Sequence, residues 1–221
     1  MDRHKAVAAA AVFMVAATAL LAVTDATQLR AQPFGFLGWG VQAGIGAGYV
    51  DYAGGITGLD PGWGMGFSIN PFAEFSLAGA ARLQAGLRLG RFKNHSEVNR
   101  DRGEGWGEIV LDYVSVPVFA KLVFPSRPRL FVAAGPELAF IWSAESRTGI
   151  NGVEDHYDLS SGVERFNLTL DAGFGIEFDA GGRTIVVQGL YCHGLLSLAK
   201  EGYWLADWET REITLTAGIL F

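Results

Sequence analysis

The sequence predicts an all-β fold, a closed antiparallel up-and-down barrel of about eight strands. Three observations lead to this prediction. Apolar and polar residues alternate with a period of two in repeated runs, and polar segments that are alternately short and long separate the runs. The chain also holds 30 glycines but only 7 prolines in 221 residues. No amphipathic helix of useful length interrupts the pattern after residue 31.

The N-terminal segment is predicted to be an export signal that is cleaved. The opening five residues include an arginine and a lysine, and 6–23 is an almost uninterrupted apolar run. Ala31 is the preferred cleavage position and Ala26 the second choice. An uncleaved anchor is the alternative, because a helix over the apolar run could nearly span a bilayer. The predicted organisation is a signal peptide at 1–31 and one β-domain at 32–221.

Charge and cysteine content exclude several classes of protein. The formal net charge is −6, and no basic stripe exists that could bind a nucleic-acid backbone. Cys192 is the only cysteine, so an exported chain has no internal disulfide. This residue is expected to pack as a small apolar side chain rather than to act as a nucleophile. No motif indicates a cofactor or a metal ion.

The first half of the β-domain contains three alternating runs. The first covers 39–49 and the second 63–75, each with its apolar residues on one face. A tight turn at 78–80 connects the second run to the third, which covers 83–89. The polar residues 93–108 are predicted to form a long loop.

The middle of the chain continues in the same way. A nearly continuous apolar run covers 109–124, and the proline-rich segment 125–128 closes it. The fifth run covers 132–142, and a second long loop is predicted over 143–164. The sixth run, 166–178, alternates without exception.

The last two strands complete the predicted barrel. A glycine turn at 180–182 leads into a run over 184–198, whose upper half has an ambiguous facing. A loop containing Trp204 and Trp208 follows. The last run, 213–221, ends the sequence with a phenylalanine.

Other features favour a barrel that spans a membrane over a soluble one, which would show the same alternation. The polar face is small and rich in glycine, and aromatic residues lie near the ends of the runs. Aromatic rings with one hydrated side settle at bilayer interfaces. Two aromatic girdles are therefore predicted, although β-prone residues could also fall there by chance: one at Trp39, Phe75, Phe124, Phe131, Phe178 and Phe221, the other at Tyr49, Trp63, Tyr113, Trp142, Phe166 and Tyr191.

Three segments carry a resemblance to a known family. They are LDYVSVP at 111–117, the Gly-Pro pair at 135–136 and the alternating C-terminal run that ends in Phe221. With them the chain resembles the outer-membrane β-barrel (porin-like) domain family of Gram-negative bacteria, and it is similar in size to OmpA/OmpX-type small barrels. The resemblance implies an outer-membrane location, membrane lipid as the surroundings, and no shared reaction or ligand. It also implies a C-terminal signal read by the barrel-insertion machinery: Ile213, Leu215, Ala217, Ile219 and Phe221.

The inward face of such a barrel is predicted to carry charges of both signs that pair across the lumen. These residues are Glu74, Arg82, Arg88, Lys121, Glu137, Asp171, Glu177 and Glu212. Side chains fill the interior of an eight-stranded barrel, so a plug of ion pairs is expected. A narrow or gated channel for ions or small solutes is the alternative.

Other candidate sites have a simpler explanation. His193 and Ser197 could belong to a lipid-modifying enzyme, but four residues along a strand separate them too far for a ready hydrogen bond. The predicted loop 143–164 carries a mostly acidic group of residues that could bind Ca²⁺, but their order does not match an EF-hand, and they are expected to be solvated. These residues are Glu145, Glu154, Asp155, His156 and Asp158. Trp106, Trp204 and Trp208 could contact lipopolysaccharide or a partner, or pack on the rim.

Together these patterns predict a general class of function but do not identify a partner. The expected protein is an integral outer-membrane barrel with a structural, adhesive or surface-interaction role, and not an enzyme. The sequence encodes no motif that identifies its specific partner.

Overall fold

A computed structural model describes residues 34–52, 59–60, 62–100, 103–150, 153–200 and 208–221. The predicted signal peptide, both cleavage positions and Trp204 lie outside these residues. Within them, no helix has the length and apolar character needed to cross a bilayer.

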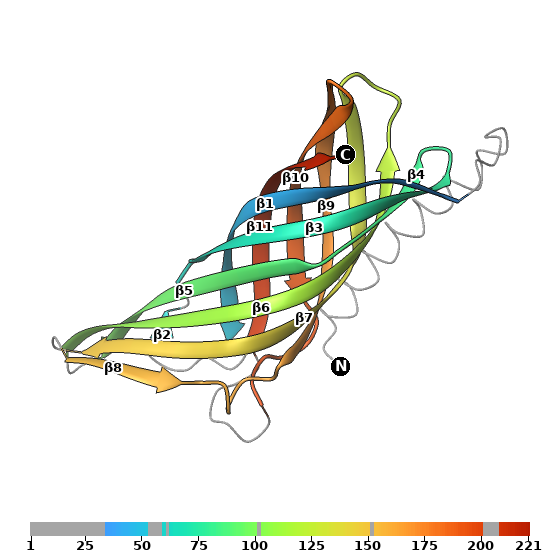
Figure 1. Cartoon of the computed structure of the whole chain (residues 1–221). Helices are drawn as coiled ribbons and strands as arrows, with labels where there is room; N and C mark the ends of the chain where they lie inside the picture. Colours follow the sequence, from blue (N-terminus) through green and yellow to red (C-terminus); the bar gives the residue numbers. More distant parts are fainter. Residues whose placement is uncertain (1–33, 53–58, 61, 101–102, 151–152, 201–207) are drawn as a thin grey trace, which may run out of the picture.

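The described residues form one antiparallel sheet (Figure 1). Its strands are β1 (Gly35–Tyr52), β2 (Leu59–Asp60), β3 (Gly64–Ala78), β4 (Ala81–Gly86), β5 (Arg88–Arg100), β6 (Gly103–Val123), β7 (Arg129–Ile150), β8 (Val153–Asp158), β9 (Phe166–Ala180), β10 (Arg183–Gly194) and β11 (Trp208–Leu220).

The sheet closes into a ring of eight strands, which confirms the predicted fold. Strand β11 pairs with β1 from Gly40↔Leu220 to Tyr52↔Trp208, so the ends of the chain close the barrel. Strands β4 and β5 act as one strand interrupted at Leu87, since both pair with β3 on one side and β6 on the other. Closure pairs the backbone amides of the ring, as a bilayer requires.

Both predicted long loops are wrong in part, because strands run through them. Strand β5 continues to Arg100 and β6 begins at Gly103 within the expected loop 93–108. Likewise β7 continues to Ile150, and β8 lies in the expected loop 143–164. These segments have polar residues on the outward face, so the apolar alternation fades while the backbone ladder continues.

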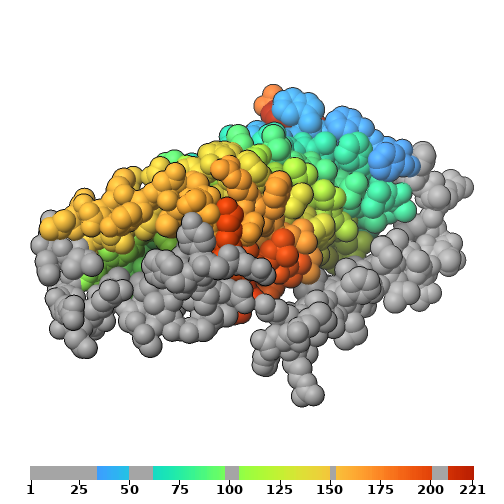
Figure 2. All heavy atoms as spheres, turned by 90° about the horizontal axis from the view of Figure 1, so that it is seen from below, coloured from blue at the N-terminus to red at the C-terminus, as the bar shows by residue number. Residues whose placement is uncertain are grey.

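Strands β5, β6, β7 and β8 extend together far beyond the rest of the ring, at the end opposite the short turns. Strands β6 and β7 have 21 and 22 residues, whereas a tilted strand crosses a bilayer in about 9–11. Figure 1 shows these strands projecting side by side, and Figure 2 shows β7 and β8 at one end of an elongated body with β1 at the other. We call this part the extension.

The outward face of the ring is an apolar belt, as expected for contact with lipid. Side chains exposed there include Val41, Ile45, Met65, Phe67, Ile69, Leu89, Val116, Val132, Leu138, Phe174, Ile185, Leu215 and Ile213. On β5 the exposed outward residues change from Leu89 to Arg91, Lys93 and Glu97. The belt therefore ends near this position, and the extension lies beyond it.

The inside of the barrel holds two separate apolar clusters. One lies toward the short turns and includes Phe72, Phe119, Phe131 and Val186. The other lies at the base of the extension and consists of Phe92, Leu111, Ile141, Ala144, Val163 and Leu198. We call the second group the apolar cap.

Candidate functional site

Five charged side chains lie together in the lumen at the short-turn end, and we call them the ion cluster. The ammonium of Lys121 lies 3.0 Å from Glu74 and 2.5 Å from Glu177, and all three side chains are fully enclosed. Arg82 pairs with Glu74 at 2.7 Å and with Glu177 at 3.4 Å. Arg129 adds a contact of 3.0 Å to Glu177. Three cations thus surround two buried carboxylates, which stabilises the otherwise unfavourable buried charge.

A second group of polar residues lies higher in the lumen. The guanidinium of Arg88 lies 2.7 Å from Glu137, and the Ser115 hydroxyl donates to the same carboxylate at 2.6 Å. The Thr169 hydroxyl donates to Asp171 at 2.7 Å. All eight charged residues predicted for the lumen face inward, but the structure divides them into two groups: Glu74, Arg82, Lys121 and Glu177 in the ion cluster, and Arg88, Glu137, Asp171 and Glu212 above it.

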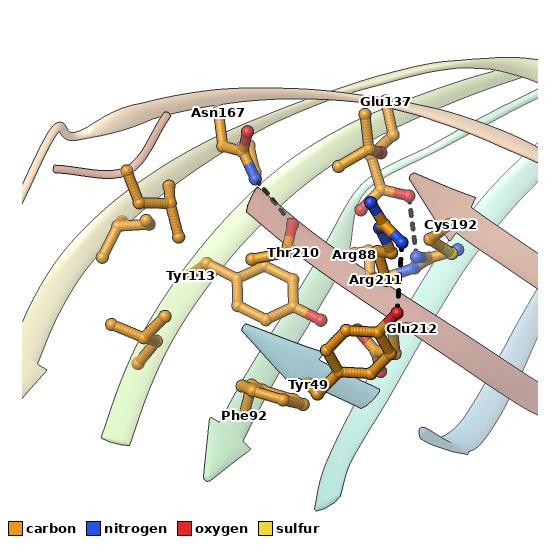
Figure 3. A pocket seen from close by; sticks show the side chains of 15 residues that line it. Tyr49, Arg88, Phe92, Tyr113, Glu137, Asn167, Cys192, Thr210, Arg211 and Glu212 are labelled. Atoms are coloured by element: carbon orange, nitrogen blue, oxygen red, sulfur yellow. Dashed lines mark hydrogen bonds and ion pairs between the residues drawn. The ribbon is translucent and has the colours of Figure 1, made fainter. Parts of the chain in front are cut away.

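A cavity of about 70 Å³ lies between the second group and the apolar cap (Figure 3). Its polar side is formed by Arg88, Glu137, Asn167 and Glu212, together with the rings of Tyr49 and Tyr113. Its apolar side is formed by Phe92, Leu111, Ile141 and Leu198. We call this space the chamber.

The apolar cap covers the chamber because two connecting segments fold across the barrel. The Glu164 amide donates to the Leu198 carbonyl at 2.7 Å, and the Lys200 amide donates to the Gly162 carbonyl at 3.1 Å. The Ile141 amide donates to the Arg165 carbonyl at 2.7 Å. These bonds fasten the segments to one another and to β7.

The predicted girdles are found in part. At the short-turn end, the rings of Trp39 and Phe221 stack with centroids 4.6 Å apart. At the other edge of the belt, the rings of Tyr49 and Trp63 are 5.7 Å apart, and Tyr49 also lines the chamber. Six further girdle residues lie on the outward face: Phe75, Phe124, Trp142, Phe166, Phe178 and Tyr191.

Phe131 and Tyr113 do not belong to the girdles, because both rings lie inside the barrel. Phe131 is buried and packs under the Lys121 ammonium, 4.1 Å from the ring centroid. Tyr113 lines the chamber. Each ring faces a glycine across the sheet, Gly175 for Phe131 and Gly90 for Tyr113, and a Cβ at either glycine would collide with the ring. Each cross-strand glycine therefore leaves the space that the inward-facing ring occupies.

The alternation of inward and outward residues along each strand would have shown that Phe131 and Tyr113 are not girdle residues. Phe131 shares its parity with Glu137, and Tyr113 shares its parity with Ser115, so both fall on the inward face. Arg129 has the same parity as Glu137 and pairs in register with Glu177. It could have been added to the predicted lumen charges on that basis.

The five residues of the predicted C-terminal signal share one face of β11. Ile213, Leu215 and Ala217 are exposed on the apolar belt, and Ile219 is half-buried there. The Phe221 amide donates to the Trp39 carbonyl at 2.8 Å. The residues of the predicted signal are therefore part of the seam that closes the barrel.

The remaining candidates lie outside the lumen or at its rim. Ser197 accepts a hydrogen bond from the Ala199 amide at 3.2 Å, and the His193 ring stacks on Tyr191 with centroids 6.3 Å apart. That the protein is not an enzyme stays a prediction.

The acidic residues and Trp106 belong to the extension, Trp208 lies at the start of β11, and Trp204 lies outside the described residues. Every residue of β8 is exposed, and no group of three or more acidic, histidine or cysteine side chains among the described residues is arranged to hold a metal ion. The Ser160 hydroxyl and amide hydrogen-bond to Asp158 and lower the pKa of its carboxyl. The Trp106 ring stacks on His95 in the extension, 6.1 Å between centroids, and Trp208 begins β11.

Comparison with known proteins gives a family match over most of the chain. The family model described as outer membrane protein beta-barrel domain matches residues 27–200. A search of curated proteins returned no match.

Solved structures with a similar fold are small barrels. Neisserial surface protein A is 12% identical with a TM-score of 0.46, and the match covers 85% of this chain and 99% of that one. Ail, the attachment invasion locus protein of Yersinia pestis, is 15% identical with a TM-score of 0.41, and the match covers 83% of this chain and 99% of Ail. The outer membrane protein OprG from Pseudomonas aeruginosa is 9% identical with a TM-score of 0.39, and the match covers 84% of this chain and 95% of OprG.

Proposed function

Since the chain belongs to the outer membrane protein beta-barrel domain family and lies in the bacterial outer membrane, we propose that it is a non-conducting barrel that presents its extension at the cell surface as an interaction surface. The projection of β5 to β8 beyond the apolar belt is the observation that carries this proposal. In such barrels the short turns face the periplasm and the long hairpins face the exterior.

Two groups of side chains in the lumen, one on each side of the chamber, support a barrel that does not conduct. The ion cluster obstructs the periplasmic end, and the apolar cap obstructs the outer end. An ion entering the lumen would have to displace Lys121 from two carboxylates and then cross an apolar layer. Both steps are unfavourable because they leave charge without a partner.

The chemistry of the extension supports contact with another protein. Its outer surface carries ion pairs, Arg91 with Asp112 at 2.6 Å and Lys93 with Glu108 at 2.6 Å, in place of apolar residues. Strand β8 pairs only with β7 among the described strands. Its second edge therefore offers backbone groups to which an extended segment of a partner can add as a further strand.

Planar-bilayer recording tests the non-conducting barrel. We expect the refolded protein to give no conductance steps over the voltage range at which the bilayer itself is stable. Regular single-channel steps that disappear when the protein is boiled before insertion would favour the narrow channel instead.

Removal of one hairpin tests the interaction surface. Deleting residues 147–156 shortens β7 and removes most of β8, and we expect it to reduce attachment of displaying bacteria to one another and to cultured cells. Deleting residues 97–106 shortens the neighbouring hairpin and keeps β8, so it is the matched control. Equal attachment by all three forms, at equal surface amounts, would refute the proposed role of β8.

The C-terminal residue gives a test of assembly. We propose that the barrel-insertion machinery reads the apolar face of β11, and expect deletion of Phe221 to reduce the amount of folded barrel in the outer membrane. Phe178→Ala removes an aromatic ring from the same rim and is the control. Fractionation with unheated gels measures the folded fraction, and unchanged assembly after deletion would argue against the signal.

A further inference from the structure

We propose that the chamber binds a small primary ammonium compound with a short aliphatic chain. The chamber lies inside the barrel, above the ion cluster and below the apolar cap, and it has no part in the proposed surface role. Its volume of about 70 Å³ corresponds to roughly five water molecules, or to a ligand of a few heavy atoms in their place.

The charges that line the chamber favour a cation. Arg88 is paired with Glu137, so this ion pair contributes no net charge. Glu212 also lines the chamber, and its carboxylate belongs to none of the ion pairs found among the described residues. The Arg211 guanidinium, on the next residue, donates to the Tyr49 hydroxyl at 3.2 Å. The Glu212 side chain is half-buried and has no ion pair of its own within the described part of the chain, so a bound ammonium would add a cation in contact with it.

The neighbouring polar atoms provide the hydrogen-bond acceptors that an ammonium needs. Asn167 is buried and lines the chamber; its Nδ2 donates to Thr210 at 3.4 Å, while its Oδ1 has no partner (Figure 3). Glu212 and the Asn167 carbonyl can each accept from an ammonium, which has three donors. Arg88 retains Nε and Nη2 without a partner, and an oxygen of water or of the ligand would accept from them.

The apolar side of the chamber is the reason that the proposed ligand has a short aliphatic chain. Phe92, Leu111, Ile141 and Leu198 belong to the apolar cap and line the chamber together. An aliphatic chain that displaces water from these side chains gains the free energy of apolar burial. Glycines make the site possible, because a Cβ at Gly46 would collide with the Glu212 carboxylate in its present position.

A set of three probes of nearly equal size tests this proposal on the whole mature barrel in detergent micelles. Propylammonium, 1-propanol and propionate differ in charge but share the same chain, and backbone and side-chain amide NMR signals report where each binds. We expect saturable shifts at Asn167 and Glu212 with propylammonium only. Saturable shifts with propionate would place an anion on Arg88, and equal shifts with all three would indicate plain cavity filling; either result overturns the proposal, as does the absence of any saturable shift.

A variant identifies the group that selects the cation. Glu212→Gln keeps the size of the side chain and removes its charge, so we expect propylammonium affinity to fall about tenfold or more. Glu145→Gln neutralises an exposed carboxylate on the extension and is the matched control, with no change expected. Unaltered affinity in a folded Glu212→Gln barrel would overturn the assignment; if that variant does not fold, the comparison of the three probes on the natural chain decides.

Discussion

Replacing Lys121 with methionine is expected to lower the free energy of unfolding by about 3–5 kcal/mol. The substitution keeps the apolar stem but removes the ammonium that contacts Glu74 and Glu177, both fully enclosed. Arg82 and Arg129 cannot replace it completely, because they approach the cluster from its partly exposed side. Urea unfolding of the barrel in lipid vesicles, followed by the mobility of unheated samples, measures the loss.

Lys93→Met is the matched control for this experiment. Lys93 also pairs with a glutamate, Glu108 at 2.6 Å, but 55% of its side chain is exposed. Exposed ion pairs contribute about 0–1 kcal/mol, so a small change is expected. A similar loss in both variants would mean that burial of the ion cluster does not determine its contribution.

Replacing Leu215 with arginine is expected to destabilise the barrel by about 2–4 kcal/mol in a bilayer. Leu215 lies in the middle of β11, between Ile45 and Gly189 in register, and 55% of it is exposed on the apolar belt. Arginine at this depth would bring a charge into hydrocarbon. The measurement is again the free energy of unfolding in vesicles, since detergent micelles adapt to the charge more easily.

Tyr157→Arg provides the comparison outside the belt. Tyr157 is exposed to a similar degree, but it lies on β8 in the extension. Arginine there should leave stability nearly unchanged. If Leu215→Arg proved as harmless as Tyr157→Arg, or if it yielded a barrel that stays in solution without detergent, the outward face of β11 would not face lipid.

The ring itself could be predicted because the membrane imposes a strict pattern on the chain. In 166–178 every second residue meets lipid, so apolar and polar side chains alternate throughout β9. Beyond the belt this constraint ends. Lys93, His95 and Glu97 present charged or polar side chains on the outward face, and a chain of that composition resembles a loop although its backbone is paired.

The lumen could be predicted only as a set of charges, not as an arrangement. The inward parity identifies Lys121 and Glu137 equally well. In the structure, however, Lys121 belongs to the ion cluster and Glu137 pairs with Arg88 beside the chamber. Their separation depends on which strands are neighbours and how those strands are staggered. The chamber was not predictable either, because it arises where Gly46 and Gly90 leave room and where the segment containing Leu198 folds over the top.

The seam between β1 and β11 has a consequence for biogenesis. The first and last strands of the barrel form one ladder, and the final amide, that of Phe221, completes it at the Trp39 carbonyl, 2.8 Å away. Without β11, β1 keeps only β3 as a neighbour, and the backbone donors and acceptors on its other edge are available to another strand. A polypeptide without β11 cannot complete its cylinder, because one edge of β1 and one edge of β10 would then lack the strand that joins them.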